Sequence, residues 1–271
     1  MMRRIISIAV MLLAFCTFAK GEQSLLLNTG YDYSVPGPYK TVTTYISNRR
    51  DDYWIYIEPF PPINPALGPS WVLQLPSTDG KNDWSPAMAG SNWINARKTE
   101  AGGGSSPANN GYVLFKKGFC LLPGFNPASL TFQIRADNQA FLYLNSVTNP
   151  LGTVPQNFLS DKPFDGHTAN QTYFKVGMNW LYVLVEDFGG GMGFDLVGDI
   201  KANGVLPNVA RWDENAQDAV FAPCPCSTPP PNLPGGPKNA TVRARAEEDD
   251  KKAINEIIKI AEAHRAAKGK K

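Results

Sequence analysis

The sequence predicts an all-β fold, a β-sandwich, on three observations. Several segments between residues 129 and 200 alternate apolar and polar side chains with the period of two that a half-buried strand requires. The chain of 271 residues contains 24 glycines and 23 prolines, a supply of turn residues that suits many short strands better than a helical bundle. Hydrophobic residues make up 43% of the chain, enough for two layers to enclose a sizeable core.

Four segments carry the strand pattern most clearly. Residues 130–135 alternate apolar and polar side chains, and residues 140–144 return after a turn at Asp137-Asn138. Residues 180–185 are a continuous apolar run, short enough to be a strand that is buried on both faces. Residues 194–200 alternate again. The polar members of the first segment, which we expect on its wet face, are Thr131, Gln133 and Arg135.

Residues 31–95, which include strands predicted at 41–46 and 53–57, contain most of the aromatic side chains that we expect near a ligand. Aromatic faces stack on the C–H surface of sugars, and amide groups fix the hydroxyls, in a concave site with few polar groups. The alternative is that the tryptophans fill the core, and Trp54 is expected to face inward. Trp84, in a turn-rich context, is the best ligand candidate. The predicted ligand-binding residues are Trp84, Tyr33, Tyr39, Asn92 and Trp93, although core packing is the stronger expectation for Trp93.

Short strings along the chain resemble the galactose-binding-domain-like β-sandwich of secreted bacterial proteins. The strings are GFNPASL at 124–130, RADN at 135–138, FLYLN at 141–145 and GMNWL at 177–181, with LNTG at 27–30, WI at 93–94 and YVLF at 112–115. The resemblance covers residues 24–203 and implies a jelly-roll β-sandwich, a scaffold with many binding roles.

The resemblance also implies that a structural calcium ion is held by side chains at strand ends, with Asp137, Asn138 and Asp195 as candidate ligands. The residues themselves favour a simpler interpretation, because no loop has the one-three-five spacing of a dedicated calcium loop. Asp137-Asn138 is then a turn whose side chains bond nearby backbone amides. No other cofactor is expected.

The two ends of the chain differ in character from the predicted sandwich. Residues 1–19, with Arg3-Arg4 before an apolar run and Ala19 at its exit, predict a secretory signal peptide, hence a secreted, periplasmic or cell-surface protein. The run is too short for a membrane anchor, and no other segment approaches a transmembrane length. Residues 204–237 predict an irregular segment, with a short helix or irregular cover at 212–221, and then a Pro-rich linker.

Residues 238–271 predict a charged tail, which contains ten Lys and Arg residues and six Asp and Glu residues. Within this tail, residues 247–267 predict an amphipathic helix. A helix with so narrow an apolar stripe is marginal alone. It therefore docks on a partner, pairs with a second copy in an oligomer, or stays frayed in solvent. The residues of the stripe are Ile254, Ile257, Ile258 and Ala261.

Three cysteines remain once the predicted signal peptide is removed: Cys120, Cys224 and Cys226. In an exported protein we expect Cys120 to form a disulfide with one of the other two, which would tie the segment after the sandwich back onto it. The remaining thiol is then available to another chain.

The sequence favours binding over catalysis. The formal net charge is +2, which gives no reason to expect a nucleic-acid partner. The chain has two histidines, His167 and His264, and no serine lies in a nucleophile-elbow pattern. The leading hypothesis is a secreted, non-catalytic module that binds carbohydrate through loop aromatics. The alternatives are a structural or assembly protein of the cell envelope or an extracellular appendage, attached to neighbours through its tail, and an uncharacterised hydrolase.

Overall fold

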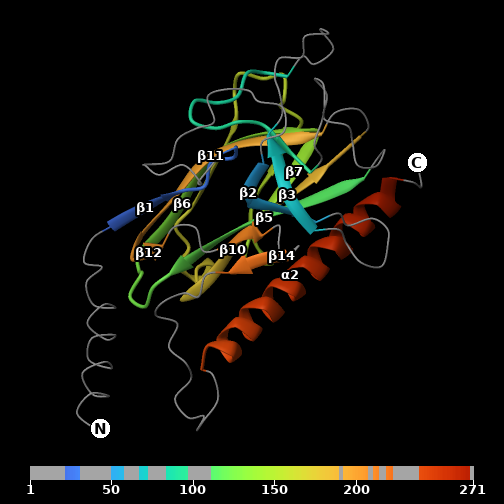
Figure 1. Cartoon of the computed structure of the whole chain (residues 1–271). Helices are drawn as coiled ribbons and strands as arrows, with labels where there is room; N and C mark the ends of the chain where they lie inside the picture. The colour runs from blue at the N-terminus through green and yellow to red at the C-terminus, as the bar shows by residue number, and fades with distance from the viewer. Residues whose placement is uncertain are drawn as a thin grey trace, which may run out of the picture.

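The structure is a computed structural model that describes residues 22–30, 50–57, 67–72, 84–96, 111–188, 192–206, 210–213, 218–221 and 238–268. These residues form antiparallel strands in two facing layers, followed by a long helix near the C-terminus (Figure 1). This confirms the antiparallel sheets and the C-terminal helix that the sequence predicts. The predicted signal peptide and the predicted strand at 41–46 lie outside the described residues.

The first layer contains five strands that hydrogen-bond to one another in the order β8-β7-β10-β5-β2. All their pairings are antiparallel. Their bounds are β8 Ser146–Val154, β7 Gln139–Leu144, β10 Gly177–Glu186, β5 Tyr112–Leu121 and β2 Arg50–Ile57.

The second layer contains β6, β9, β11 and β1, with β11 paired to both β6 and β1. Two further strands, β3 and β4, continue the hydrogen bonding from β2 to β11, so the two layers belong to one folded-over sheet. The bounds are β6 Ala128–Asp137, β9 Phe164–Thr168, β11 Gly193–Asn203, β1 Glu22–Leu26, β3 Leu67–Val72 and β4 Ile94–Asn95.

The core lies between the layers because the period of two places one set of side chains from each strand inside. Even-numbered residues of β6 and β11 meet odd-numbered residues of β5 and β10 in one buried cluster. Phe115 of β5 packs edge-to-face on Phe194 of β11, with 4.9 Å between ring centroids. Phe132 and Leu181 are buried there as the alternation predicts.

Helix α2 (Lys238–Lys268) covers the outer face of the first layer, which makes the molecule three layers deep there (Figure 1). Tyr182 and Leu184 of β10 are fully buried beneath it, on the face opposite Leu181 and Val183. This explains why residues 180–185 are apolar without interruption. The prediction of a strand buried on both faces is therefore correct, and the helix of the same chain provides the second cover.

The apolar stripe of α2 contacts this sheet. Ile257 and Ala261 are fully buried against it, while Ile254 and Ile258 are half-buried. The helix also begins at Lys238, earlier than the predicted residue 247. The expectation that a partner, a second copy or solvent covers the stripe is corrected, because the sheet of the same chain already does so.

Short elements complete the described structure. Residues 210–221 contain two paired strands, β13 (Ala210–Asp213) and β14 (Asp218–Phe221), where the sequence predicts a short helix or irregular cover. Aromatic and β-branched residues such as Trp212 and Val220 favour the strand conformation, which accounts for the difference. Strand β12 (Val205–Leu206) pairs with β5, and a 3₁₀ helix spans Gln171–Tyr173. The described helical residues contain no stretch with the length and apolar character of a membrane span.

Candidate functional site

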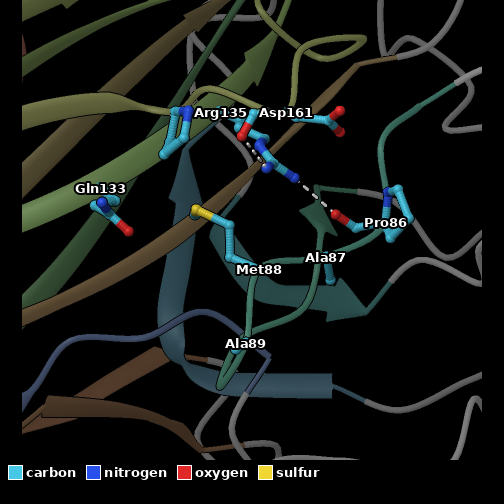
Figure 2. Close-up of a pocket in the computed structure, with 8 residues that line it drawn as sticks. Pro86, Ala87, Met88, Ala89, Gln133, Arg135 and Asp161 are labelled. Atoms are coloured by element: carbon cyan, nitrogen blue, oxygen red, sulfur yellow. Dashed lines mark hydrogen bonds between the residues drawn. The ribbon is translucent and has the colours of Figure 1, made fainter.

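Two loops meet over the outer face of β6, and between them lies an open hollow of about 400 Å³ (Figure 2). One loop is residues 84–92, which lead into β4, and the other is residues 155–163, between β8 and β9. The loops contact each other directly, because the Ser85 N–H donates to the Phe158 carbonyl at 2.7 Å. The residues that line the hollow are Pro86, Ala87, Met88, Ala89, Gln133, Arg135, Asp161 and Pro163.

Arg135 holds the two loops together from the floor of the hollow. It lies on β6 between the core residues Ile134 and Ala136, so the strand alternation points its side chain outward. Its guanidinium donates to the Pro86 carbonyl at 2.7 Å and to the Asp161 carbonyl at 3.0 Å, one from each loop (Figure 2). The loops cover it so closely that only 7% of the residue is exposed. A rigid strand thus fixes the position of a buried cation.

The electrostatic neighbour of Arg135 is Asp195, directly opposite it on β11. The oxygens of Asp195 accept hydrogen bonds from the Met88 N–H at 2.7 Å and from the hydroxyl groups of Ser91 and Thr29. Burial raises the pKa of Asp195 to about 6, although these hydrogen bonds and Arg135 oppose the rise. Asp195 therefore supports the 84–92 loop from below.

Trp84 begins the loop that forms one wall of the hollow. The ring is half-buried, with its centroid 4.7 Å from that of Trp93 and 6.2 Å from that of Phe158. Its indole N–H also donates to the side chain of Asp137. The candidate that the sequence favours most thus lies next to the hollow but does not line it.

The structure places the other predicted ligand contacts elsewhere. Trp93 is 1% exposed and its indole N–H donates to the Ser85 carbonyl at 3.0 Å, while Asn92 is buried and bonded to the backbone of residues 29–30. These two residues are interior supports of the 84–92 loop, which corrects the prediction that they contact ligand. Tyr33 and Tyr39 lie outside the described residues.

The three candidate calcium ligands take part in hydrogen bonds within the protein. In the described part of the chain, no group of three or more His, Cys, Asp or Glu side chains is placed to hold a metal ion. Asn138 donates to Asp137 at 2.6 Å and accepts from the Phe188 N–H at 2.6 Å, which is the turn role that the residues favour. Asp195 is occupied by the donors of the 84–92 loop, as described above. The side chains of Asp137, Asn138 and Asp195 therefore serve the protein's own hydrogen bonding.

Burial also raises the pKa of Asp137, to about 7. Hydrogen bonds from Trp84 and Asn138 oppose this rise, and the nearby Asp187 carboxylate adds to it.

Cys120, on β5, is disulfide-bonded and fully buried. Cys224 and Cys226 lie outside the described residues, so the pairing of Cys120 with either of them stays a prediction.

The residues that line the hollow were not among the predicted ligand contacts. Gln133 and Arg135 are expected on the wet face of their strand, and Gln133 is exposed there. Strand alternation gives no sign that two distant loops cover Arg135. Met88 and Asp161 carry no motif. The sequence feature that points to this site is Arg135, a long cationic residue between the apolar residues Ile134 and Ala136 of a predicted strand.

Neither a protein-family model nor a curated protein matches the chain. Among solved structures, it is similar to an FMN-binding β-glucuronidase from Facaelibacterium prausnitzii L2-6, with 15% identity, a TM-score of 0.30, and 71% of this chain and 23% of that chain covered. It is also similar to a β-glucuronidase from uncultured Clostridium sp., with 14% identity, a TM-score of 0.33, and 68% of this chain and 29% of that chain covered. A family 35 carbohydrate-binding module from an environmental isolate is 12% identical, with a TM-score of 0.28, and 46% of this chain and 85% of that chain are covered. The chain spans about a quarter of the length of the two glucuronidases, and similarity at these values assigns it to no family.

Proposed function

We propose that this protein is an exported, non-catalytic module that binds carbohydrate in the hollow between residues 84–92 and 155–163. The observation that carries the proposal is the hollow itself, with polar groups fixed on a strand at its floor and apolar groups on its walls. Its volume of about 400 Å³ falls in the range of about 300–1,000 Å³ that is common for small-molecule sites.

The chemistry of the lining suits a sugar, which presents C–H groups and hydroxyl groups together. Pro86, Met88 and Pro163 offer apolar surface to the C–H groups. Gln133 donates its amide N–H to Asp165 at 2.8 Å, which leaves its carbonyl oxygen to accept from a hydroxyl. Such a surface, with few polar groups at fixed positions, orients a ligand as well as holding it.

The composition of the lining favours binding without hydrolysis. Glycoside hydrolysis ordinarily needs two carboxyl groups on either side of the scissile bond. Asp161 is the one acidic residue among the eight that line the hollow, and it bonds to Arg135 through its backbone carbonyl. This supports the non-catalytic hypothesis over the hydrolase alternative. The assembly alternative loses support because the helix stripe that was to attach the protein to neighbours is buried against its own sheet.

The finer predictions on architecture and export belong to the same proposal. We infer a jelly-roll sandwich of the galactose-binding-like type, supported by the strings quoted above and by the two facing antiparallel layers. Export through residues 1–19 is supported by their basic, apolar and small-residue order.

The test is to fill the hollow and measure sugar binding on a glycan array. Ala87→Trp places an indole in the hollow, and we expect it to abolish the array signals of the wild-type protein. Ala266→Trp makes the same change at an exposed position of α2 and should leave the signals unchanged. The proposal fails if the wild-type protein binds no glycan, or if Ala87→Trp keeps its signals while the thermal unfolding curve shows an intact fold.

A further inference from the structure

Arg135 has hydrogen-bonding capacity that the described protein does not use. A guanidinium carries five N–H donors, and two hydrogen bonds to the protein are present, to the Pro86 and Asp161 carbonyls. The Nε atom is buried and has no hydrogen-bond partner among the described residues. Leaving a buried donor unsatisfied is unfavourable, and more so for a charged group.

The charge of Arg135 is also poorly compensated. In the described part of the chain, no carboxylate oxygen lies within 4.0 Å of its nitrogens, the limit for an ion pair. Asp195 attracts it electrostatically, but the oxygens of Asp195 bond to residues of the 84–92 loop and to Thr29. Asp161 is exposed and meets the guanidinium through its backbone oxygen. Buried arginines are ordinarily paired with an anion.

Arg135 is one of the residues that line the hollow, so a ligand in the hollow lies against its side chain (Figure 2). We propose, on the basis of the proposed carbohydrate function, that the ligand is an acidic sugar whose carboxylate binds Arg135. A carboxylate is a planar acceptor with two oxygens, which matches the planar fork of the guanidinium. The neighbouring Gln133 carbonyl oxygen then accepts from a hydroxyl of the same sugar.

The first experiment compares ligands on the unaltered protein and needs no substitution. Isothermal titration calorimetry on the full mature chain is run with a uronic-acid oligosaccharide, its carboxyl-reduced neutral counterpart and a sulfated neutral oligosaccharide of the same length. We expect the uronic-acid form to bind at least about tenfold more tightly than the neutral form, because a hydrogen bond to a charged group contributes more than a factor of ten.

Three outcomes overturn parts of the argument separately. Equal affinity for the acidic and neutral sugars overturns the acidic-ligand inference and leaves the carbohydrate function standing. Tighter binding of the sulfated sugar than of the uronic acid also overturns the inference, since the anion is then a sulfate ester. If none of the three sugars binds, the proposed function is overturned, and this inference with it.

The second experiment assigns the preference to Arg135. Arg135→Lys keeps the charge but loses the planar fork, so the preference for the acidic sugar should shrink without vanishing. Arg135→Met should abolish it. Arg135 also joins the two loops, so its replacement can weaken binding of every sugar. The readout is therefore the ratio of acidic to neutral affinity within each variant, because general loosening of the site lowers both affinities together and leaves their ratio unchanged.

Lys162→Gln is the matched control. Lys162 lies next to Asp161 at the rim of the hollow and is exposed. Removing its charge should leave the preference unchanged if the buried guanidinium is responsible. Loss of the preference in Lys162→Gln, with retention in Arg135→Met, means that rim charge attracts the ligand and overturns the assignment to Arg135.

Discussion

The two outer faces of the sandwich are covered in different ways. The face of β5 and β10 is closed by a helix, and its charges are matched: Lys116 bonds to Asp250 at 2.5 Å, and Tyr182 donates to the same carboxylate at 2.7 Å. At the C-terminal end of the helix, Lys268 bonds to Glu186. On the face of β6 and β11, two loops cover Arg135 and leave a hollow, while Thr131 and Gln133 of the same face are exposed. The buried guanidinium has no ion-pair partner among the described residues.

The difference separates stability from recognition. A buried charge with its partner in place contributes a specific geometry to the fold, and a helix that supplies that partner docks in one register. A buried charge with open hydrogen-bonding positions beside a hollow costs stability, and such costs concentrate at functional sites. The helix-covered face is therefore expected to respond to substitution with changes in stability, and the loop-covered face with changes in binding.

The largest effect is expected from Asp250→Ala, which removes the carboxylate that Lys116 and Tyr182 share. Asp250 is 5% exposed, so water does not replace the lost contacts. Removal of one member of a buried ion pair costs about 3–5 kcal/mol. We expect a loss of that size in the free energy of unfolding, measured by urea denaturation.

Asp250→Asn serves as the control within the same site, because it keeps an acceptor for the Tyr182 hydroxyl while removing the charge. It should cost less than Asp250→Ala. A loss below about 1 kcal/mol for Asp250→Ala, a size typical of exposed ion pairs, would show that the helix is held by its apolar stripe alone and would remove the contrast between the two faces.

Much of the sandwich could be predicted from sequence, because the order of apolar and polar residues in a strand indicates which of its two faces is buried. The alternation in residues 130–135 and the unbroken apolar run in residues 180–185 specify one and two buried faces respectively, and both are observed. The stripe of α2 was also visible. Its contact surface was not, because a stripe such as Ile257 and Ala261 indicates that something covers it and says nothing of what does.

The candidate site was less predictable for a related reason. Trp84 is an aromatic residue among turn residues, which predicts a ligand contact, and the structure places it in the wall loop, beside the hollow. Arg135 resembles any solvated arginine on the wet face of a strand until loops more than twenty residues away are placed over it. Long-range covering of this kind leaves no local pattern in the sequence.

A second prediction concerns pH and applies to the loop-covered face. The pKa of Asp137, whose side chain accepts from Trp84 at that face, is raised to about 7 in the folded protein, above its ordinary value of 3.8. The folded state therefore binds more protons than the unfolded state between these values. Its contribution to stability is fully present below pH 3.8 and is lost as the pH rises through 7.

Lowering the pH from 8 to 5 should therefore stabilise the wild-type protein through Asp137 by about 2–3 kcal/mol, since one pKa unit corresponds to about 1.4 kcal/mol. Asp195 and Asp51 change stability in the same direction, because burial raises the pKa of each to about 6. Thermal unfolding at the two pH values measures the total. In Asp137→Asn the gain should shrink by the Asp137 share, and an unchanged gain would show that Asp137 does not titrate in this range.

The smallest effect is expected from Asp249→Asn, one residue before the buried Asp250. Asp249 forms an ion pair with Lys175 at 3.3 Å, but its side chain is 64% exposed and that of Lys175 is 35% exposed. Water and salt screen such a pair, and exposed pairs contribute about 1 kcal/mol or less. We expect urea denaturation of Asp249→Asn to match the wild-type protein within that margin, and any small loss to disappear at high salt. Since Asp249 and Asp250 are neighbours on one helix, equal losses from the two would mean that the helix responds to its overall charge rather than to the buried contact. The attribution of stability to the shared carboxylate of Asp250 therefore depends on this small effect remaining small.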